Sequence, residues 1–547
     1  MTTNFVRSLG EESGVQLNPL VDGSEMPATG TADQAFCIAM RSTRGRIDKP
    51  FLVNSSNFNR RLGYGETIRS NELNEAWVQV FEAVNNGAYS AVVQRLVGND
   101  ASNNWMTATL AEPDGKVFDY AIVSKGLEPS TYDIAVKHHE CFNDGIYLEI
   151  HADEKRISGA AGANDVITLV LRDSKAVKLY EFTGSLTEGS KDDYGNSNYL
   201  PDVIESLTDS VEVRIKDGLA IAATHKAYGF DENGDVKWDK SPLLIYFTEG
   251  EVGGYTTATY VAAREKLQKT QFEYRYIASG GTKAVGLLTQ LAKLAHNTNR
   301  QFRFDVDGRL TPDQAIAFNE SLNITGFQSA HLIHAFYTPL KTTDPSGVNG
   351  KSYIGTSALN IAYACARNAA KNYKGFAPKN YPIAGKLFPL NRTGIIQMYT
   401  PDSAELSKLV MAKINPVIYE SYESGGLYVF RDSLTCAPVT NSLRKLISVV
   451  EMATTVDDAV TSAGKTFLQL PIAIAVKKMN DWLPVYFEGA EASDWLVPSD
   501  DPAMGGASFK FEARPNAARP YDQMDVGYWA RYDGTARQMF ITHTLTK

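Results

Sequence analysis

The sequence lacks the features of a membrane-spanning, secreted or disulfide-stabilised protein. No run of about 18 apolar residues occurs in it, so we expect no transmembrane helix and no insertion into a membrane. The first residues show no basic segment followed by an apolar one, so we expect no secretion signal. The four cysteines are far apart and form no CxxC pair, which predicts reduced thiols in a cytoplasmically assembled protein. They are Cys37, Cys141, Cys365 and Cys436.

The sequence also lacks a basic excess. Its 54 Lys and Arg residues are outnumbered by 63 Asp and Glu residues, and the net charge of −9 goes with a pI near 5.5. A chain that binds nucleic acid normally carries a basic footprint, so we expect no nucleic-acid partner. The hydrophobic fraction of 43% and the charged fraction of 21% are ordinary for globular proteins. Since one core rarely grows beyond about 250–300 residues, a chain of 547 residues is expected to form several domains.

Motifs for nucleotide and calcium binding are incomplete. Residues 463–466 read Ala-Gly-Lys-Thr, like the end of a phosphate-binding loop, but the pattern needs a glycine where Ala459 stands. Residues 305–308 read Asp-Val-Asp-Gly, like the start of a calcium loop, but the next ligand position holds the cation Arg309. A strand that ends in aspartate and a turn explain the second run more simply. Neither run predicts a cofactor.

Catalytic patterns are missing as well. The sequence has no Gly-x-Ser-x-Gly elbow, His-Glu-x-x-His motif or dinucleotide fingerprint. His138, His139, Glu140 and Cys141 stand near His151 and carry metal-capable atoms, but adjacent histidines on a strand point to opposite faces. Ordinary surface residues are therefore the preferred interpretation of this cluster, and a metal site is the alternative. We predict that the protein is not an enzyme and holds no metal or cofactor.

The first part of the chain predicts an α/β fold that is interrupted and then resumes. Strand-like runs at residues 35–40, 51–53 and 89–97 surround a helix at residues 72–85, whose apolar residues share one face. From residue 99 to about 250, short β-type runs are broken by Gly, Asn and Asp, which predicts a β-rich insertion. Helical patterns return at residues 255–269, 283–298, 311–322, 357–372, 403–412 and 441–460.

These changes of pattern divide the chain into five parts. We predict a multidomain α/β and α+β protein. Because the insertion interrupts an otherwise continuous pattern, we expect it to project from the middle domain, and we expect a chain without it to fold. The parts are an N-terminal arm and linker (1–34), a discontinuous α/β middle domain (35–98 with 251–398), the β-rich insertion (99–250), a C-terminal α/β domain (399–534) and a C-terminal strand arm (535–547).

Both ends of the chain carry strand-like runs. Asp533 and Gly534 separate the runs 525–532 and 535–546, which is typical of a hairpin, and a shorter run stands at residues 4–9. A terminal strand has a free edge, which it can pair within its own sheet or with another copy. The termini alone favour the first of these. The residues expected to make the contacts are Phe5, Val6, Leu9, Met539, Phe540, Ile541, Thr542 and Leu545.

Four groups of segments follow one another along the chain in a recognisable order. They are residues 35–53, 58–63, 75–81, 86–87 and 91–96; residues 180–186 and 198–206; residues 337–339, 347, 357–367 and 375–378; and residues 414–422, 428–430 and 443–450. In this order they resemble the contractile tail sheath proteins of bacteriophages. The resemblance covers most of residues 35–490. One departure is residues 351–357, which read Lys-Ser-Tyr-Ile-Gly-Thr-Ser where the family usually has a PPSG…AG stretch.

The resemblance implies a structural subunit that forms stacked hexameric rings, as a helical sheath around a tail tube. Contraction of such a sheath drives the tube through the host envelope during genome ejection. The implied partners are further copies of the chain, the tail tube protein, and the baseplate and tail terminator proteins. The implied location is the virion tail, after assembly in the cytoplasm of the host bacterium. On this interpretation the terminal arms pair between subunits rather than within one.

The resemblance also implies which parts face the tube. The insertion would point outward, and the domain at residues 399–534 would lie next to the tube, with candidate contacts at Lys408, Lys413, Arg444 and Lys445. A solvated helix face is the alternative for these four residues. For the whole chain, the alternatives are the sheath of an R-type bacteriocin or a related contractile injection system, and a β-rich carbohydrate-binding adhesin.

Overall fold

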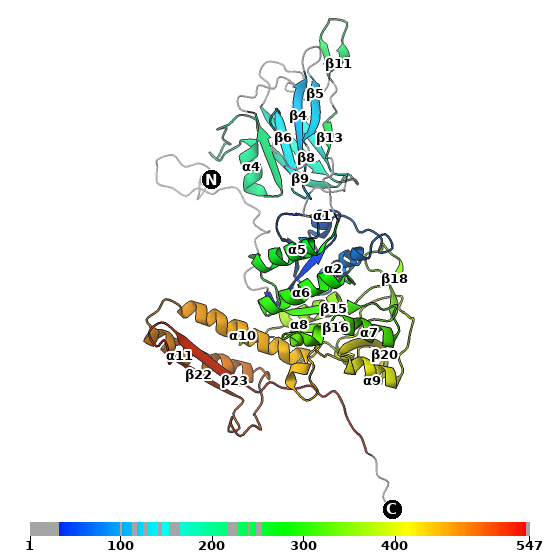
Figure 1. The fold of residues 1–547 in the computed structure, drawn as a ribbon. Helices are drawn as coiled ribbons and strands as arrows, with labels where there is room; N and C mark the ends of the chain where they lie inside the picture. The colour runs from blue at the N-terminus through cyan, green and yellow to red at the C-terminus, as the bar shows by residue number, and fades with distance from the viewer. Residues whose placement is uncertain are drawn as a thin grey trace, which may run out of the picture.

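The computed structural model describes residues 32–98, 101–111, 117–123, 129–140, 145–152, 165–216, 227–238, 241–247 and 254–542. The molecule is elongated (Figure 1). A β-rich unit lies at one end and a layered α/β body lies in the middle. A pair of long helices with a β-hairpin lies at the other end, where the last described residues lead away from the body. Within these ranges, no helix is both long enough and apolar enough to span a membrane.

The body is built on an eight-stranded sheet. Its strands are β1 (Ala35–Met40), β2 (Phe51–Val53), β3 (Ser90–Arg95), β14 (Tyr276–Ala278), β15 (Gln301–Val306), β16 (Ile333–Tyr337), β20 (Ile414–Tyr422) and β21 (Gly425–Phe430). Their order is β2-β3-β1-β14-β15-β16-β20-β21, with parallel pairing inside and an antiparallel pair at each edge. Parallel sheets are covered on both faces, and accordingly every residue of β1, β3 and β15 is buried.

Helices cover both faces of this sheet. They are α1 (Phe58–Leu62), α2 (Glu75–Asn85), α5 (Thr257–Lys269), α6 (Val285–Thr298), α7 (Pro312–Ser321), α8 (Ser357–Ala369) and α9 (Ser403–Met411). Alternate residues of β1 point to opposite faces. Phe36 and Ile38 join a core with α2 and α8, whereas Cys37 and Ala39 join a second core with α5 and α6. The α/β alternation and the positions of these helices confirm the sequence prediction to within a few residues.

The β-rich unit consists of two four-stranded antiparallel sheets that share one core. The strands are β4 (Trp105–Ala111), β5 (Val117–Val123), β6 (Ile134–His138), β7 (Tyr147–Ala152), β8 (Val166–Arg172), β9 (Lys178–Ser185), β10 (Val211–Ile215) and β13 (Leu243–Tyr246). One sheet has the order β10-β6-β4-β5 and the other β13-β7-β8-β9. Helix α4 (Leu200–Leu207) packs against the same core, and β11 (Ala227–Phe230) and β12 (Val236–Trp238) form a separate ribbon. The predicted β character of this region is confirmed.

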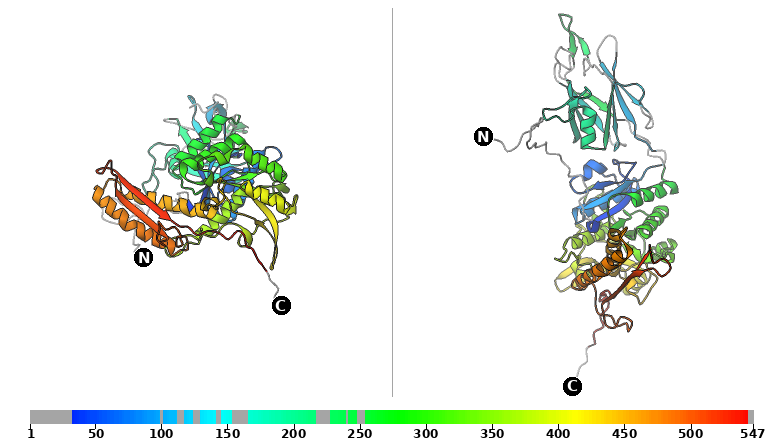
Figure 2. Two further views of the ribbon diagram at one scale, coloured as in Figure 1. Left: turned by 60° about the horizontal axis from the view of Figure 1, so that its bottom comes forward. Right: turned by 90° about the vertical axis from the view of Figure 1, so that its left-hand side faces the viewer.

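The end of the chain forms a smaller α+β unit. Its elements are α10 (Ile447–Phe467), α11 (Ile472–Glu491), β22 (Phe509–Pro515) and β23 (Met524–Ala530). Helices α10 and α11 lie side by side, and the β22–β23 hairpin packs along them (Figure 2). A separate three-stranded sheet belongs to the body. Its strands are β17 (Leu340–Thr343), β18 (Lys351–Tyr353) and β19 (Ile396–Gln397), in the order β18-β17-β19.

The predicted hairpin around Asp533 and Gly534 is wrong. Strand β23 pairs with β22, a strand that the sequence analysis missed, over its whole length. The chain after β23 does not reverse, because Asp533 N donates to Trp495 O at 3.1 Å and Tyr532 forms a bridge with Leu496. Residues 533–542 form no strand, and residues 543–547 of the predicted run lie outside the described ranges.

The body crosses the predicted boundary between residues 398 and 399. Strands β20 and β21 were assigned to the C-terminal domain, but β20 pairs in parallel with β16 of the body sheet. Helix α9 packs on β20 and contributes Leu409 to a core of the body. Periodicity alone does not reveal such long-range pairing, so the boundary was placed too early. The rest of the domain partition stays a prediction.

Candidate assembly sites

The last described residues form an exposed apolar segment. Met539, Phe540 and Ile541 are 81%, 90% and 85% exposed, and Thr542 beside them is exposed as well. Consecutive large apolar side chains in water are unfavourable and commonly mark a surface that binds a partner. Within the described part of the chain, these side chains pack against nothing that would shield them. The other predicted arm residues, Phe5, Val6, Leu9 and Leu545, lie outside that part.

The β22–β23 hairpin offers open strand edges. In the described structure each of its strands pairs only with the other, so one edge of each strand is unpaired. Phe509 and Phe511 face the helices, and the Phe509 ring stacks on Phe487 of α11 at 5.2 Å between centroids. Lys510 and Glu512 alternate with them and are exposed, so the hairpin has one buried and one solvated face. An unpaired edge of this kind can accept a strand from another chain.

The four predicted tube contacts fall into separate places. Lys408 of α9 is exposed and lies 3.2 Å from Asp313 Oδ1 of α7. Lys413 Nζ donates to Val439 O at 2.8 Å, and Lys445 Nζ donates to Thr440 O at 3.0 Å. Burial lowers the pKa of Lys413, as do the nearby charges of Lys445 and Arg537. Lys413 therefore lies near Lys445 and Arg537, and Lys408 lies elsewhere, beside α7.

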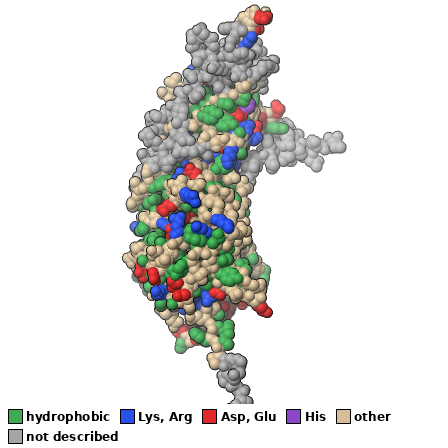
Figure 3. Space-filling view, turned by 90° about the vertical axis from the view of Figure 1, so that its right-hand side faces the viewer, with side chains coloured by type: hydrophobic (Ala, Val, Ile, Leu, Met, Phe, Trp, Pro, Cys, Tyr) green, Lys and Arg blue, Asp and Glu red, His purple; other side chains and the backbone are tan. Residues whose placement is uncertain are grey.

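Arg444, the fourth candidate, precedes Lys445 in a short 3₁₀ turn, Leu443–Lys445. Its Nη2 lies 3.1 Å from His331 Nδ1, and burial followed by the charge of Arg444 lowers the pKa of His331. On the face shown in Figure 3, acidic and basic side chains both lie on the body among apolar ones. None of this tests whether the four residues touch a tube, so that assignment stays a prediction.

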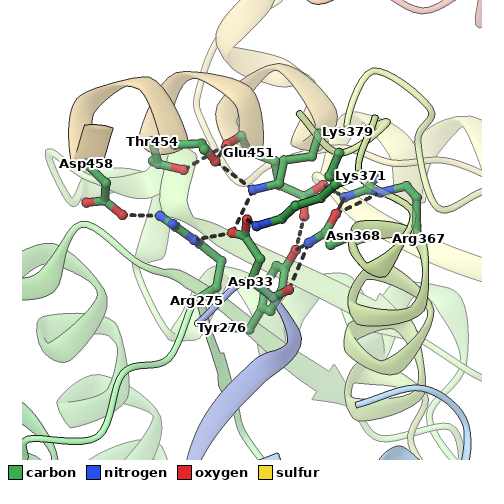
Figure 4. A network of polar contacts seen from close by, with 12 residues as sticks. Asp33, Arg275, Tyr276, Arg367, Asn368, Lys371, Lys379, Glu451, Thr454 and Asp458 are labelled. Atoms are coloured by element: carbon green, nitrogen blue, oxygen red, sulfur yellow. Dashed lines mark hydrogen bonds and ion pairs between the residues drawn. The ribbon is translucent and has the colours of Figure 1, made fainter. Parts of the chain in front are cut away.

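A buried ionic network joins the helix α10 to the body, and sequence reasoning missed it (Figure 4). Glu451 of α10 accepts hydrogen bonds from Arg367 Nη2 at 2.9 Å, Arg303 Nη2 at 3.3 Å and Tyr276 OH at 2.5 Å. All four side chains are buried. Burial raises the pKa of Glu451, but the charges of Arg367 and Arg303 outweigh it and hold the pKa at about 2. Glu451 is therefore a charged residue inside the protein.

A second part of the network holds Asp33, directly before β1. Lys379 Nζ donates to Asp33 Oδ1 at 2.8 Å, and Arg275 Nε donates to the same oxygen at 3.0 Å. Lys371 Nζ lies 3.7 Å from Asp33 Oδ2. Asn368 Nδ2 donates to the Asp33 carbonyl at 3.0 Å. Burial works against the charge of Asp33, but Lys379 and Arg275 hold its pKa well below the usual range. Burial, together with the charge of Arg275, lowers the pKa of Lys379 to about 8.

A third buried cluster joins the β-rich unit to the body. Arg61 of α1 pairs with Glu140, and Ser210 Oγ donates to the same carboxylate at 3.0 Å. Arg44 Nη2 lies 3.6 Å from Asp173 Oδ2, and both residues are buried. Removing the insertion would take Glu140 and Asp173 away from these arginines. These contacts tie the insertion to the body in the intact chain, and the expectation that a chain without the insertion folds stays a prediction.

The histidine-rich run lies in this junction and not on the surface. His138 and Glu140 are fully buried, with His138 Nε2 3.8 Å from Glu140 Oε2. Burial lowers the pKa of His139 to about 4, as does the charge of Arg46. The interpretation as ordinary surface residues is wrong for His138 and Glu140, since Glu140 is buried as the partner of Arg61 and His138 is buried beside Glu140. Among the described residues no group of His, Cys, Asp and Glu could hold a metal ion, and Cys141 lies outside them.

The two incomplete motifs have structural roles. Residues 463–466 lie inside α10, not in a loop after a strand. Asp305 at the end of β15 accepts hydrogen bonds from Thr356 N at 2.8 Å and from Ser357 N at 2.9 Å. These are donors at the first turn of α8, which have no partner within the helix. Asp305 therefore fixes the start of α8 against the sheet.

Comparison with known proteins identifies the fold. No family model matches the sequence, and no curated protein does. The structure is similar to the crystal structure of the sheath tail protein Lin1278 from Listeria innocua, with a TM-score of 0.51 and 10% identity over 90% of this chain and 94% of that one. The chain therefore has the fold of a contractile tail sheath protein, as the resemblance implied.

Two further solved structures are similar over a smaller part of the chain. One is the sheath complex of an extracellular contractile injection system, PVC, in the contracted state, with a TM-score of 0.41, 11% identity, and 55% of this chain and 76% of that one covered. The other is the baseplate of the anti-feeding prophage, with a TM-score of 0.38, 12% identity, and 56% and 77% covered. With TM-scores below 0.5, these likenesses add nothing to the assignment of the fold.

Proposed function

We propose that this chain is the structural subunit of a contractile phage tail sheath. Copies of it stack as hexameric rings around the tail tube, and contraction drives the tube through the host envelope during genome ejection. The observation that carries the proposal is the exposed apolar segment at residues 539–541, on a chain with the sheath fold. The sheath of an R-type bacteriocin would use the same subunit, and neighbouring genes for a capsid and a terminase would decide between the two.

Subunits are linked by strands donated from the chain ends. The arm at residues 535–547 pairs with an open edge of the β22–β23 hairpin in a neighbouring copy, and the shorter strand-like run at residues 4–9 adds a second link. Each backbone hydrogen bond contributes about 0.5–1.5 kcal/mol, and each fully buried large apolar side chain about 1.5–3 kcal/mol. Such links amount to several kcal/mol and do not depend on how the rigid bodies pack. They can hold while the bodies slide from an extended to a contracted lattice.

The β-rich insertion and the unit of α10, α11 and the hairpin lie at opposite ends of the elongated molecule (Figure 1). In the proposed sheath, the insertion would point outward and the opposite end would lie near the tube. Lys413 and Lys445 lie close together and would suit an acidic tube surface, whereas the charge of Arg537 beside them is paired with Asp432. Baseplate and terminator proteins cap the two ends of the sheath. The location is the virion tail, after assembly in the host cytoplasm.

The test is polymerisation of the purified protein, followed by negative-stain microscopy and sedimentation. Full-length protein should form striated tubes, and a chain without residues 537–547 should remain a folded monomer. Phe540→Pro and Phe540→Ala form a matched pair, because both remove the ring but only proline removes a backbone donor. We expect proline to block tubes and alanine only to weaken them. Normal tubes from the truncated chain would contradict donation of this strand.

A further inference from the structure

Both proposed arms leave the body next to an ionic contact that fixes the chain. On the N-terminal side this is Asp33, which lies in the short turn Ala32–Gln34 before β1. On the C-terminal side it is Arg537, two residues before the exposed segment 539–541. Arg537 Nε donates to Asp432 Oδ1 at 2.8 Å, and its Nη2 bonds Oδ2 of the same carboxylate. A bidentate pair of this kind is directional and stronger than a single neutral hydrogen bond.

The side chains that bind Asp33 also bind α10, which belongs to the C-terminal α+β unit. Arg275 bonds both Asp33 and Asp458 of α10. Lys379 Nζ likewise donates to Asp33 at 2.8 Å and to Thr455 Oγ1 of α10 at 2.8 Å. Arg275 and Lys379 thus bridge Asp33, at the start of the described chain, to α10 (Figure 4). That helix packs against α11, on which the β22–β23 hairpin lies.

Arg537 is connected to the body sheet through its partner Asp432. Asp432 follows β21 by two residues, and its Oδ1 also accepts a hydrogen bond from Ser433 N at 2.9 Å. Upstream of Arg537, Asp533 N donates to Trp495 O and Val497 N donates to Arg531 O at 2.9 Å. The chain is therefore held up to residue 537. Beyond that residue, the side chains of Met539, Phe540 and Ile541 are exposed.

We infer that Asp33 and the Arg537–Asp432 pair are anchors that pass load from the donated arms into the rigid body. The inference rests on the proposed function, because only donated arms carry load. Without an anchor, a pull on an arm would peel the adjoining chain from the body one contact at a time. With it, force from the N-terminal arm reaches α10, which supports the acceptor hairpin, and force from the C-terminal arm reaches the body sheet through Asp432.

The C-terminal anchor is tested with Arg537→Gln, Asp432→Asn and the double exchange Asp432→Arg with Arg537→Asp. The matched control is Arg214→Gln, since Arg214 pairs with Glu212 on the surface of the insertion. Tubes of each variant are diluted into mild urea and their loss is followed by light scattering. We expect the single variants to assemble but to lose tubes about tenfold faster, with the exchange restoring stability and the control unchanged. Single variants as durable as the unaltered protein would overturn the inference.

The N-terminal anchor is tested with Asp33→Asn, which should also speed the loss of tubes, with Asp202→Asn on the exposed face of α4 as its control. If Asp33→Asn does not fold, the C-terminal variants decide. If the unaltered protein forms no tubes at all, the proposed function fails, and the anchor is then judged on the monomer by hydrogen exchange. In Arg537→Gln the amides at residues 531–536 should exchange about tenfold faster, since local opening controls exchange. Unchanged exchange would overturn the anchor independently of sheath assembly.

Discussion

Replacement of Glu451 by glutamine should strongly destabilise the attachment of α10 to the body. The substitution keeps the size of the side chain but removes the negative charge that faces Arg367 and Arg303, both of which are buried. Removing one partner of a buried ion pair costs about 3–5 kcal/mol, because the remaining charge has neither water nor a counter-charge. We expect Glu451→Gln to lower the free energy of unfolding by about this amount. Glu488→Gln, on the exposed face of α11, is the control and should change it by less than about 0.5 kcal/mol.

The same residue predicts a pH dependence. The pKa of Glu451 is lowered from 4.5 to about 2 in the folded protein, so the unfolded chain binds the proton more readily. Its contribution is therefore present above pH 4.5 and is lost as the pH falls towards 2. A difference of this size corresponds to about 3 kcal/mol. Urea unfolding at several pH values, followed by tryptophan fluorescence, measures it. If Glu451→Gln lowered the free energy of unfolding by less than about 1 kcal/mol, or if the unaltered protein and the variant showed the same pH slope, Glu451 would not be a stabilising buried charge.

Three other predictions concern assembly and the junction. Charge reversal at Lys408 and Lys445 should reduce co-sedimentation of the sheath protein with an acidic tube protein, but should not affect its polymerisation without a tube. If co-sedimentation and polymerisation fell equally, these lysines would instead make contacts between sheath subunits. Removal of residues 1–9 should weaken polymerisation less than removal of residues 537–547, as sedimentation of the two variants would show. Excision of residues 99–250 removes the partners of Arg61 and Arg44 but also exposes both guanidinium groups to water, so the remaining body should still fold; an aggregated chain without helical circular dichroism would contradict this partition.

Local patterns in the sequence predicted much of the body. The helix α2 was found because Trp77, Val80 and Val84 recur on one face. Asn71 marks the start of the 3₁₀ turn Glu72–Asn74 that precedes α2, where its side chain accepts a hydrogen bond from Leu73 N. The strands of the insertion were found because β-branched and aromatic runs alternate with turn residues. In both cases the signal lies within one element, so no knowledge of the rest of the fold is needed.

The missed features depend on contacts between distant residues. Glu451 stands in an apolar helix, but its partners Arg367 and Arg303 are 84 and 148 positions away, and no spacing rule connects them. The strand β22 does alternate in sequence, with Phe509 and Phe511 each followed by a charged residue, and this signal was overlooked in favour of Asp533-Gly534. The pairing of β20 with β16 shows the same limit, since a parallel neighbour leaves no mark in the local pattern.

The most direct measurement is a cryo-electron microscopy reconstruction of tubes formed by the full-length protein. We expect a helical lattice in which residues 537–547 of one subunit run as a strand along β22 or β23 of a neighbouring subunit, with Arg537 still bound to Asp432 of its own subunit. A reconstruction in which this segment folds back onto its own subunit, or in which the hairpin edges stay unpaired, would contradict strand donation between subunits.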